Sequence, residues 1–99
     1  MPLPRAGRRR VAVAGASLAV LRRRIDALDR RIVRLLGRRL RVVRALRPYK
    51  RHIPDPRREV QVLAQVRGEA RRCQADPVFV AEVYRGLLGA SRAFQKRAS

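Results

Sequence analysis

Ionisable and polar side chains share the apolar faces of the helices that this sequence predicts. At about 100° per residue, Arg39 and Lys50 fall in line with the leucine and isoleucine row of the first expected helix. Glu59 shares the apolar stripe of the second helix. In the third, Ser91 lies on the stripe and Gln95 follows one turn later. One such residue would be ordinary, but five of them on inward faces indicate a polar site inside the protein.

The charges of this site do not balance. An unpaired buried cation is very costly, so Arg39 and Lys50 with only Glu59 require more negative charge. Arg22 and Arg58, just off their stripes, increase the positive surplus. A small ligand with two carboxylates is the simplest source of the missing charge. Arginine can hold a carboxylate through two hydrogen bonds, whereas lysine is a point donor. The residues alone therefore indicate a helical pocket for a small dianion.

Three helices are expected to position these residues. From Ser17, a suitable N-cap, to about residue 49, apolar residues recur at three- and four-residue steps. Pro48 should kink or terminate this helix. The pairs Asp55-Pro56 and Asp76-Pro77 predict the next two helix starts, because Asp caps a helix and Pro suits its first turn. The expected inward faces are Leu21, Ile25, Leu28, Ile32, Leu35, Leu36, Val43 and Leu46; then Glu59, Val62, Leu63, Val66 and Ala70; and finally Val80, Val83, Tyr84, Leu87, Ser91 and Phe94.

The length of the first helix predicts a dimer. A helix of ~32 residues is ~48 Å long, whereas a compact globule of ~100 residues has a radius of gyration near ~13 Å. Two helices of about half that length cannot cover the whole apolar stripe. The sequence therefore predicts an all-α fold with one long and two shorter helices per chain. Short links favour antiparallel neighbours, and the rest of the stripe is expected to be buried in an intertwined homodimer.

Composition limits the class of protein. The 99 residues allow one domain, in which residues 1–16 are expected to be a basic, flexible extension and residues 17–99 the helical domain. No stretch approaches the ~20 apolar residues that cross a bilayer, so a cytoplasmic location is expected. Cys73 and His52 are each the only residue of their kind. They offer no disulfide, no metal-ligand spacing and no nucleophile–histidine set, so no metal or cofactor is expected.

The net charge of +19 favours an anionic partner of some kind. A basic helical nucleic-acid binder is the rival interpretation from another class, and it would bind with a steep salt dependence. Aromatic residues for base stacking make up only 4% of the chain. The cations also surround the helices instead of forming one exposed patch. A nucleic-acid partner is therefore not expected.

Several motifs, in order, resemble the all-helical (AroQ-class) chorismate mutases and their relatives, the isochorismate-pyruvate lyases. The similarity runs from about residue 18 to residue 96 and opens with L-R-x-x-I-D-x-L-D at residues 21–29. It continues through Leu36-Gly37-Arg38-Arg39 and Tyr49-Lys50 to D-x-x-R-E at residues 55–59 and S-x-x-x-Q at residues 91–95. One departure is the short connection between Lys50 and Asp55, in which the chain is shorter than is usual in these enzymes.

The resemblance implies a role for each matching residue. Arg39 and Arg22 would hold the two substrate carboxylates, with Arg22 reaching across from the partner subunit. Lys50 and Gln95 would donate to the ether oxygen of the enolpyruvyl group. Glu59, helped by the backbone near Asp55, would accept from the ring hydroxyl. Ser91 would bind the ring carboxylate, and Arg58 would complete the positive wall.

The reaction that the resemblance implies is the Claisen rearrangement of chorismate to prephenate, which makes the chain an isomerase. Two alternatives share the fold. The segments Leu36 to Arg39 and Ile53-Pro54 resemble those of the isochorismate-pyruvate lyases. That branch, however, lacks the Glu and Ser found here as Glu59 and Ser91. A 4-amino-4-deoxychorismate mutase would bind an amine where chorismate has a hydroxyl, and Glu59 could accept from either. A weak mutase that an acidic partner enzyme activates is a further alternative.

Overall fold

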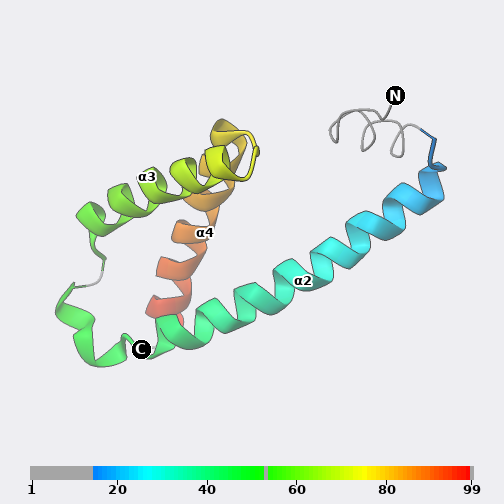
Figure 1. Cartoon of the computed structure of the whole chain (residues 1–99). Helices are drawn as coiled ribbons and strands as arrows, with labels where there is room; N and C mark the ends of the chain where they lie inside the picture. Colours follow the sequence, from blue (N-terminus) through cyan, green and yellow to red (C-terminus); the bar gives the residue numbers. More distant parts are fainter. Residues whose placement is uncertain (1–14, 53, 99) are drawn as a thin grey trace. The chain divides into compact units, whose positions relative to one another are not determined.

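A computed structural model of the chain describes residues 15–52 and 54–98 (Figure 1). The side chains of Lys50 and His52 lie outside the described part, as does most of the expected N-terminal extension. The described residues contain helices and no strand, so the all-α prediction is confirmed. The elements are α2 (Leu18–Arg44), the 3-10 helix η1 (Arg47–His52), α3 (Pro56–Arg72) and α4 (Pro77–Ala98).

The chain divides into two compact units, one ending at Arg38 and the other spanning Arg39–Ser99. The described part of the first unit is most of α2, as far as Arg38, and the few residues before the helix. Ser17 caps this helix as predicted, because its Oγ accepts a hydrogen bond of 3.2 Å from the backbone N–H of Val20. The second unit contains the last turns of α2, η1, α3 and α4.

The long helix ends sooner than the sequence predicted. α2 stops at Arg44 after 27 residues, not near residue 49. The cause is Pro48, whose ring clashes with the carbonyl four residues earlier and whose nitrogen cannot donate. The chain tightens to bonds spanning three residues, from Ala45 to Val42 (3.0 Å) and from Leu46 to Val43 (3.0 Å). η1 follows, and it is broken at Tyr49, where φ −105° and ψ 33° are not helical.

Both Asp-Pro pairs begin helices as predicted. Asp55 is the N-cap of α3, and its Oδ1 accepts a hydrogen bond of 3.1 Å from the backbone N–H of Arg58. Asp76 does the same for α4, with Oδ1 accepting from the backbone N–H groups of Val78 (2.8 Å) and Phe79 (3.3 Å). The proline that follows each aspartate loses no bond, because the first turn of a helix has no internal acceptor for its N–H.

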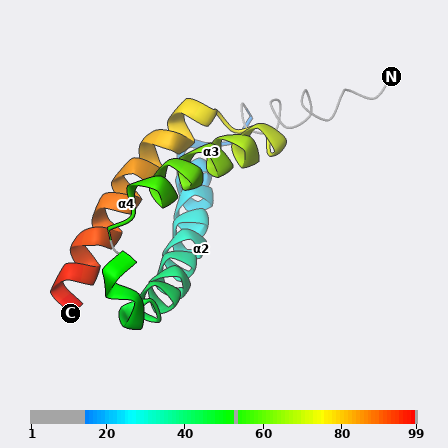
Figure 2. The same cartoon turned by 90° about the vertical axis from the view of Figure 1, so that its left-hand side faces the viewer.

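A tight turn returns the chain from α3 to α4. The backbone N–H of Ala75 bonds to the carbonyl of Ala70 at 2.8 Å, and that of Gln74 to Arg71 at 3.2 Å. This pair of bonds is a Schellman motif, which satisfies the last carbonyls of α3. The motif requires a left-handed residue, and Gln74 supplies it with φ 58°. α4 then turns back alongside α3 (Figures 1 and 2).

Within the described part of the chain, only Ala70, Ala81, Leu88 and Ser91 are buried. The expected inward residues of α3 are all buried or half-buried. The prediction for α4 was partly wrong, since Val83 is 51% exposed while Ala81 and Leu88 are buried. The true buried face of α4 is rotated toward Ala81, whose small side chain suits close packing of two helices near their turn.

The apolar stripe of α2 is uncovered in the single chain. No residue of α2 is buried. Its stripe is exposed from 37% at Leu36 to 58% at Leu35, and only Leu21 and Val43 of the stripe are half-buried. Such a continuous apolar face on a helix otherwise rich in arginine is typical of a surface that another chain covers. None of the helices in the described ranges is long and apolar enough to span a bilayer.

Candidate active site

A pocket of about 390 Å³ lies within the second unit, which is the size of many small-molecule sites. The end of α2, η1, the start of α3 and the second half of α4 all contribute to its wall. Its apolar lining consists of Val42, Val43, Leu46, Pro54, Val62 and Leu88, with the ring of Tyr49. Its polar lining consists of Arg39, Asp55, Arg58, Glu59, Ser91, Arg92 and Gln95.

Most of the predicted site residues line this one pocket. Arg39 comes from α2, Asp55, Arg58 and Glu59 from the cap and first turn of α3, and Ser91 and Gln95 from α4. Two predicted residues are not among them. Lys50 falls in η1, and its side chain lies outside the described part of the structure. Arg22 belongs to the first unit and is exposed on α2.

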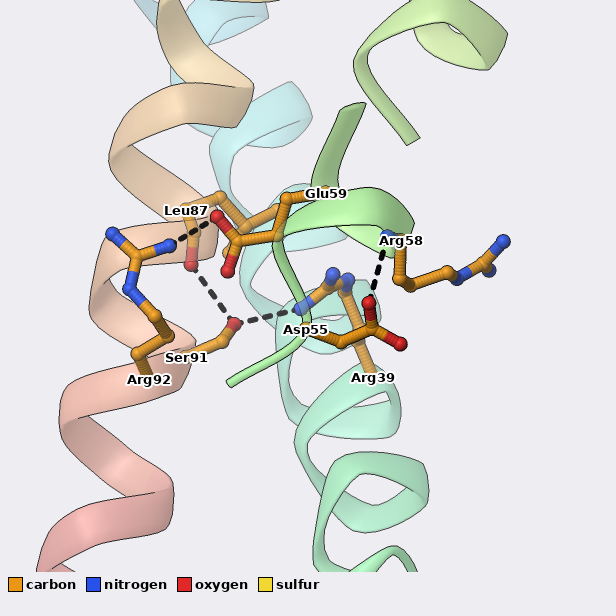
Figure 3. A network of polar contacts seen from close by, with 7 residues as sticks. All are labelled: Arg39, Asp55, Arg58, Glu59, Leu87, Ser91 and Arg92. Atoms are coloured by element: carbon orange, nitrogen blue, oxygen red, sulfur yellow. Dashed lines mark hydrogen bonds and ion pairs between the residues drawn. The ribbon is translucent and has the colours of Figure 1, made fainter. Parts of the chain in front are cut away.

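Arg39 and Ser91 are directly bonded. Nη1 of Arg39 donates to Oγ of Ser91 at 2.8 Å, and that hydroxyl donates in turn to the carbonyl of Leu87 at 2.9 Å (Figure 3). Ser91 is 7% exposed and is the only buried polar residue of the described part. Because a guanidinium has five N–H donors, one bond to Ser91 leaves Arg39 able to bind a carboxylate.

The capped first turn of α3 positions Asp55, Arg58 and Glu59 at the pocket. Asp55 uses its carboxylate to hold the backbone N–H of Arg58, which fixes where the helix begins. Figure 3 shows the guanidinium of Arg58 extending away from Arg39 and Ser91, although the residue lines the pocket. Glu59 instead turns toward α4. The start of α3 thus presents a carboxylate to the pocket interior.

Sequence reasoning missed Arg92. Its Nη1 forms an ion pair with Oε1 of Glu59, joining α4 to α3 (Figure 3). On a helix, the residue after Ser91 is turned by about 100° and therefore lies off the apolar stripe. The signal available was its position between Ser91 and Gln95, where a long side chain can still reach the edge of the same face.

The residues of the described polar lining include three arginines, Arg39, Arg58 and Arg92, and two acidic residues, Asp55 and Glu59. The balance is one positive charge before the side chain of Lys50 is considered. Apolar walls weaken the screening of these charges by water. Such a pocket can bind a small anion, and hydroxyl and amide groups at Ser91 and Gln95 can fix its orientation.

The sequence matches the family model described as chorismate mutase type II over residues 21–96. The match includes most of the chain and extends through both units, from the start of α2 to the end of α4. It contains every residue of the polar lining and also Arg22 and Lys50. Comparison with curated proteins and with solved structures gave no match.

Proposed function

Because this chain belongs to the chorismate mutase type II family, we propose that it converts chorismate to prephenate. The observation that carries the proposal is the pairing of Arg39 with Ser91 in an apolar-walled pocket. A guanidinium held in place by a buried hydroxyl is preorganised to receive a carboxylate. Chorismate carries two carboxylates, and the positive balance of the pocket supports a dianionic substrate.

Catalysis in this proposal is mainly a matter of conformation. The rearrangement breaks one carbon–oxygen bond while it forms one carbon–carbon bond within a single molecule, without a covalent intermediate. Arg39 and Ser91 bind the ring carboxylate of the substrate. Arg58 adds positive charge to the wall of the pocket. Gripping both carboxylates selects the folded conformer in which the reacting carbons approach, and such positioning supplies several kcal/mol.

Electrostatic stabilisation supplies the second part. As the ether bond lengthens, negative charge grows on its oxygen. Gln95 lines the pocket one turn beyond Ser91, where its amide can donate to that oxygen. Lys50 is proposed as the second donor. Donors that are already oriented in a dry site lower the barrier without reorganising. No proton transfer is needed, so the reaction as proposed requires no cofactor.

Glu59 is proposed to accept from the ring hydroxyl of the substrate, next to the capped start of α3. Its side chain is 27% exposed, less than those of the other two ion-paired carboxylates of the described residues. The backbone around Asp55 lies beside it, since that residue is the N-cap.

Arg22 is proposed to complete the site from a partner subunit. Arg22 and Arg39 are 17 residues apart in the sequence, a separation that corresponds to ~25 Å in an α-helix at 1.5 Å per residue. One molecule of chorismate is far smaller than this separation, so a single chain cannot apply both residues to one substrate. We propose that a second copy of the chain covers the exposed stripe of α2, in the homodimer predicted from the sequence. The exposure of that stripe in the single chain supports this proposal.

Incubation of the pure protein with three substrates tests the proposal. Chorismate should yield prephenate, detected by its acid-catalysed conversion to phenylpyruvate. Isochorismate should yield no pyruvate, and 4-amino-4-deoxychorismate should be a poorer substrate than chorismate. Release of pyruvate from isochorismate, with chorismate unchanged, would instead assign the chain to the lyase branch.

A further inference from the structure

The ion pair between Glu59 and Arg92 differs from the other ion pairs of the described residues. Arg72–Glu69 and Arg85–Glu82 each join side chains three residues apart on one helix. Glu59 and Arg92 are 33 residues apart and join α3 to α4 at the pocket wall. Glu59 is also the least exposed partner, at 27% against 62% and 68% for the other two carboxylates.

The Arg92 guanidinium packs over Gly89 of its own helix. Its Nη2 lies 3.5 Å from the point that a Cβ at residue 89 would occupy, an ordinary contact distance. The guanidinium therefore lies back over the preceding turn of α4, toward the start of α3, as Figure 3 shows. Both its ion pair and this packing direct the charge to the place where Glu59 meets the pocket.

The pair changes what Glu59 can accept. Arg92 uses Oε1 of the carboxylate, and a carboxylate has about four lone-pair sites, so Glu59 retains the capacity to accept from a hydroxyl. Its negative charge, however, is already matched by Arg92. A neutral hydroxyl needs only a lone pair. A positively charged amine needs the unmatched charge as well, and it would also lie close to the Arg92 guanidinium.

We propose that Arg92 is a specificity-determining residue that favours a ring hydroxyl over a ring ammonium group in the substrate. The inference rests on the proposed function, in which Glu59 faces this substituent. Each positive charge near the pocket, that of Arg92 included, attracts a ligand of net charge −2 more strongly than one of net charge −1. Loss of Arg92 removes one positive charge beside Glu59 and therefore weakens this preference.

The test compares kcat/KM for chorismate and for 4-amino-4-deoxychorismate in four proteins. Arg92→Gln keeps a polar side chain and removes the charge, and Arg92→Lys keeps the charge. Arg85→Gln is the matched control, since it breaks an exposed pair within α4. Arg92→Gln should raise the ratio of the amino substrate to chorismate by about tenfold, as expected when one close charge is removed. Arg92→Lys and Arg85→Gln should leave the ratio within about twofold of the starting value.

Each result separates this inference from the proposed function. If the unaltered protein converts chorismate but Arg92→Gln lowers both substrates equally, Arg92 has only a structural role and the inference is overturned alone. An unaltered protein that prefers the amino substrate overturns it as well. If the unaltered protein converts neither substrate, the proposed function fails and the inference fails with it. A ratio that rises in Arg92→Gln and is restored in Arg92→Lys supports the inference.

Discussion

The guanidinium of Arg39 donates a hydrogen bond of 2.8 Å to the hydroxyl of Ser91, 52 residues later in the chain. This bond joins the end of α2 to α4 without any intervening side chain (Figure 3). The hydroxyl of Ser91 donates in turn a hydrogen bond to the carbonyl of Leu87, so it has little freedom to rotate. The pocket therefore has one cation whose position is set by the fold before any ligand arrives.

Arg39→Ala should lower kcat/KM for chorismate by about 10³-fold, because a buried, hydrogen-bonded partner of a charged ligand group is lost. Arg38→Ala is the control, since Arg38 is exposed and its substitution removes the same formal charge. Both variants should change nonspecific binding to DNA only slightly, with a salt dependence shifted by about one counterion. Full activity in Arg39→Ala would show that the assigned pocket is wrong.

Ser91→Ala should raise KM more than it lowers kcat, because the orientation of Arg39 is lost while the donors to the ether oxygen are kept. The buried hydrogen bond also contributes about 1 kcal/mol to the free energy of unfolding. Steady-state kinetics and thermal unfolding measure the two effects separately. An unchanged KM together with a lower unfolding temperature would contradict the role assigned to Ser91 and leave it a packing residue.

The two helix caps should respond differently to the same substitution. Asp55→Ala and Asp76→Ala each remove a carboxylate that accepts from backbone N–H groups, at a cost of about 1 kcal/mol of stability. Asp76 begins α4 at the end remote from Ser91, so its variant should keep full activity at temperatures where it is folded. Asp55 lines the pocket, and its variant should lose activity as well. Equal activity in the two variants would argue against a site at the start of α3.

Mixing two inactive variants tests the shared site. Arg22→Ala and Arg39→Ala homodimers should each be inactive. After the subunits exchange, about half of the dimers are mixed, and each of these has one complete and one doubly defective site. Activity should therefore return to about a quarter of the original value. No recovery after verified exchange would mean that Arg22 and Arg39 act from the same chain or in different sites.

The sequence predicted the helix starts better than the helix ends. Asp55-Pro56 and Asp76-Pro77 are local signals, since cap and first turn are adjacent in the chain, and both gave correct starts. The end of α2 at Arg44 is set by Pro48, because the proline ring clashes with the carbonyl of the residue four positions earlier. A pattern of apolar spacing alone continues through that point, which is why the helix was predicted too long.

Stripe geometry predicted that Arg39, Glu59, Ser91 and Gln95 line one pocket, because inward faces of packed helices must meet. Asp55 came instead from the family resemblance. Stripe geometry could not predict Arg92, whose Cα lies off the stripe and whose long side chain reaches Glu59. It also misplaced the buried face of α4 at Val83. That error arose because the helix has apolar residues on two faces, and periodicity does not say which of them another helix covers within the chain.

Three of the four buried residues in the described part are alanine or serine. These side chains are small, so their burial removes little apolar surface from water. A chain with so small a buried core should gain much of its stability from association with a second copy, and this stability should depend on protein concentration. If folding is coupled to dimerisation, tenfold dilution should lower the apparent free energy of unfolding by about 1.4 kcal/mol of dimer. The midpoint of thermal unfolding should then fall as the protein concentration is lowered.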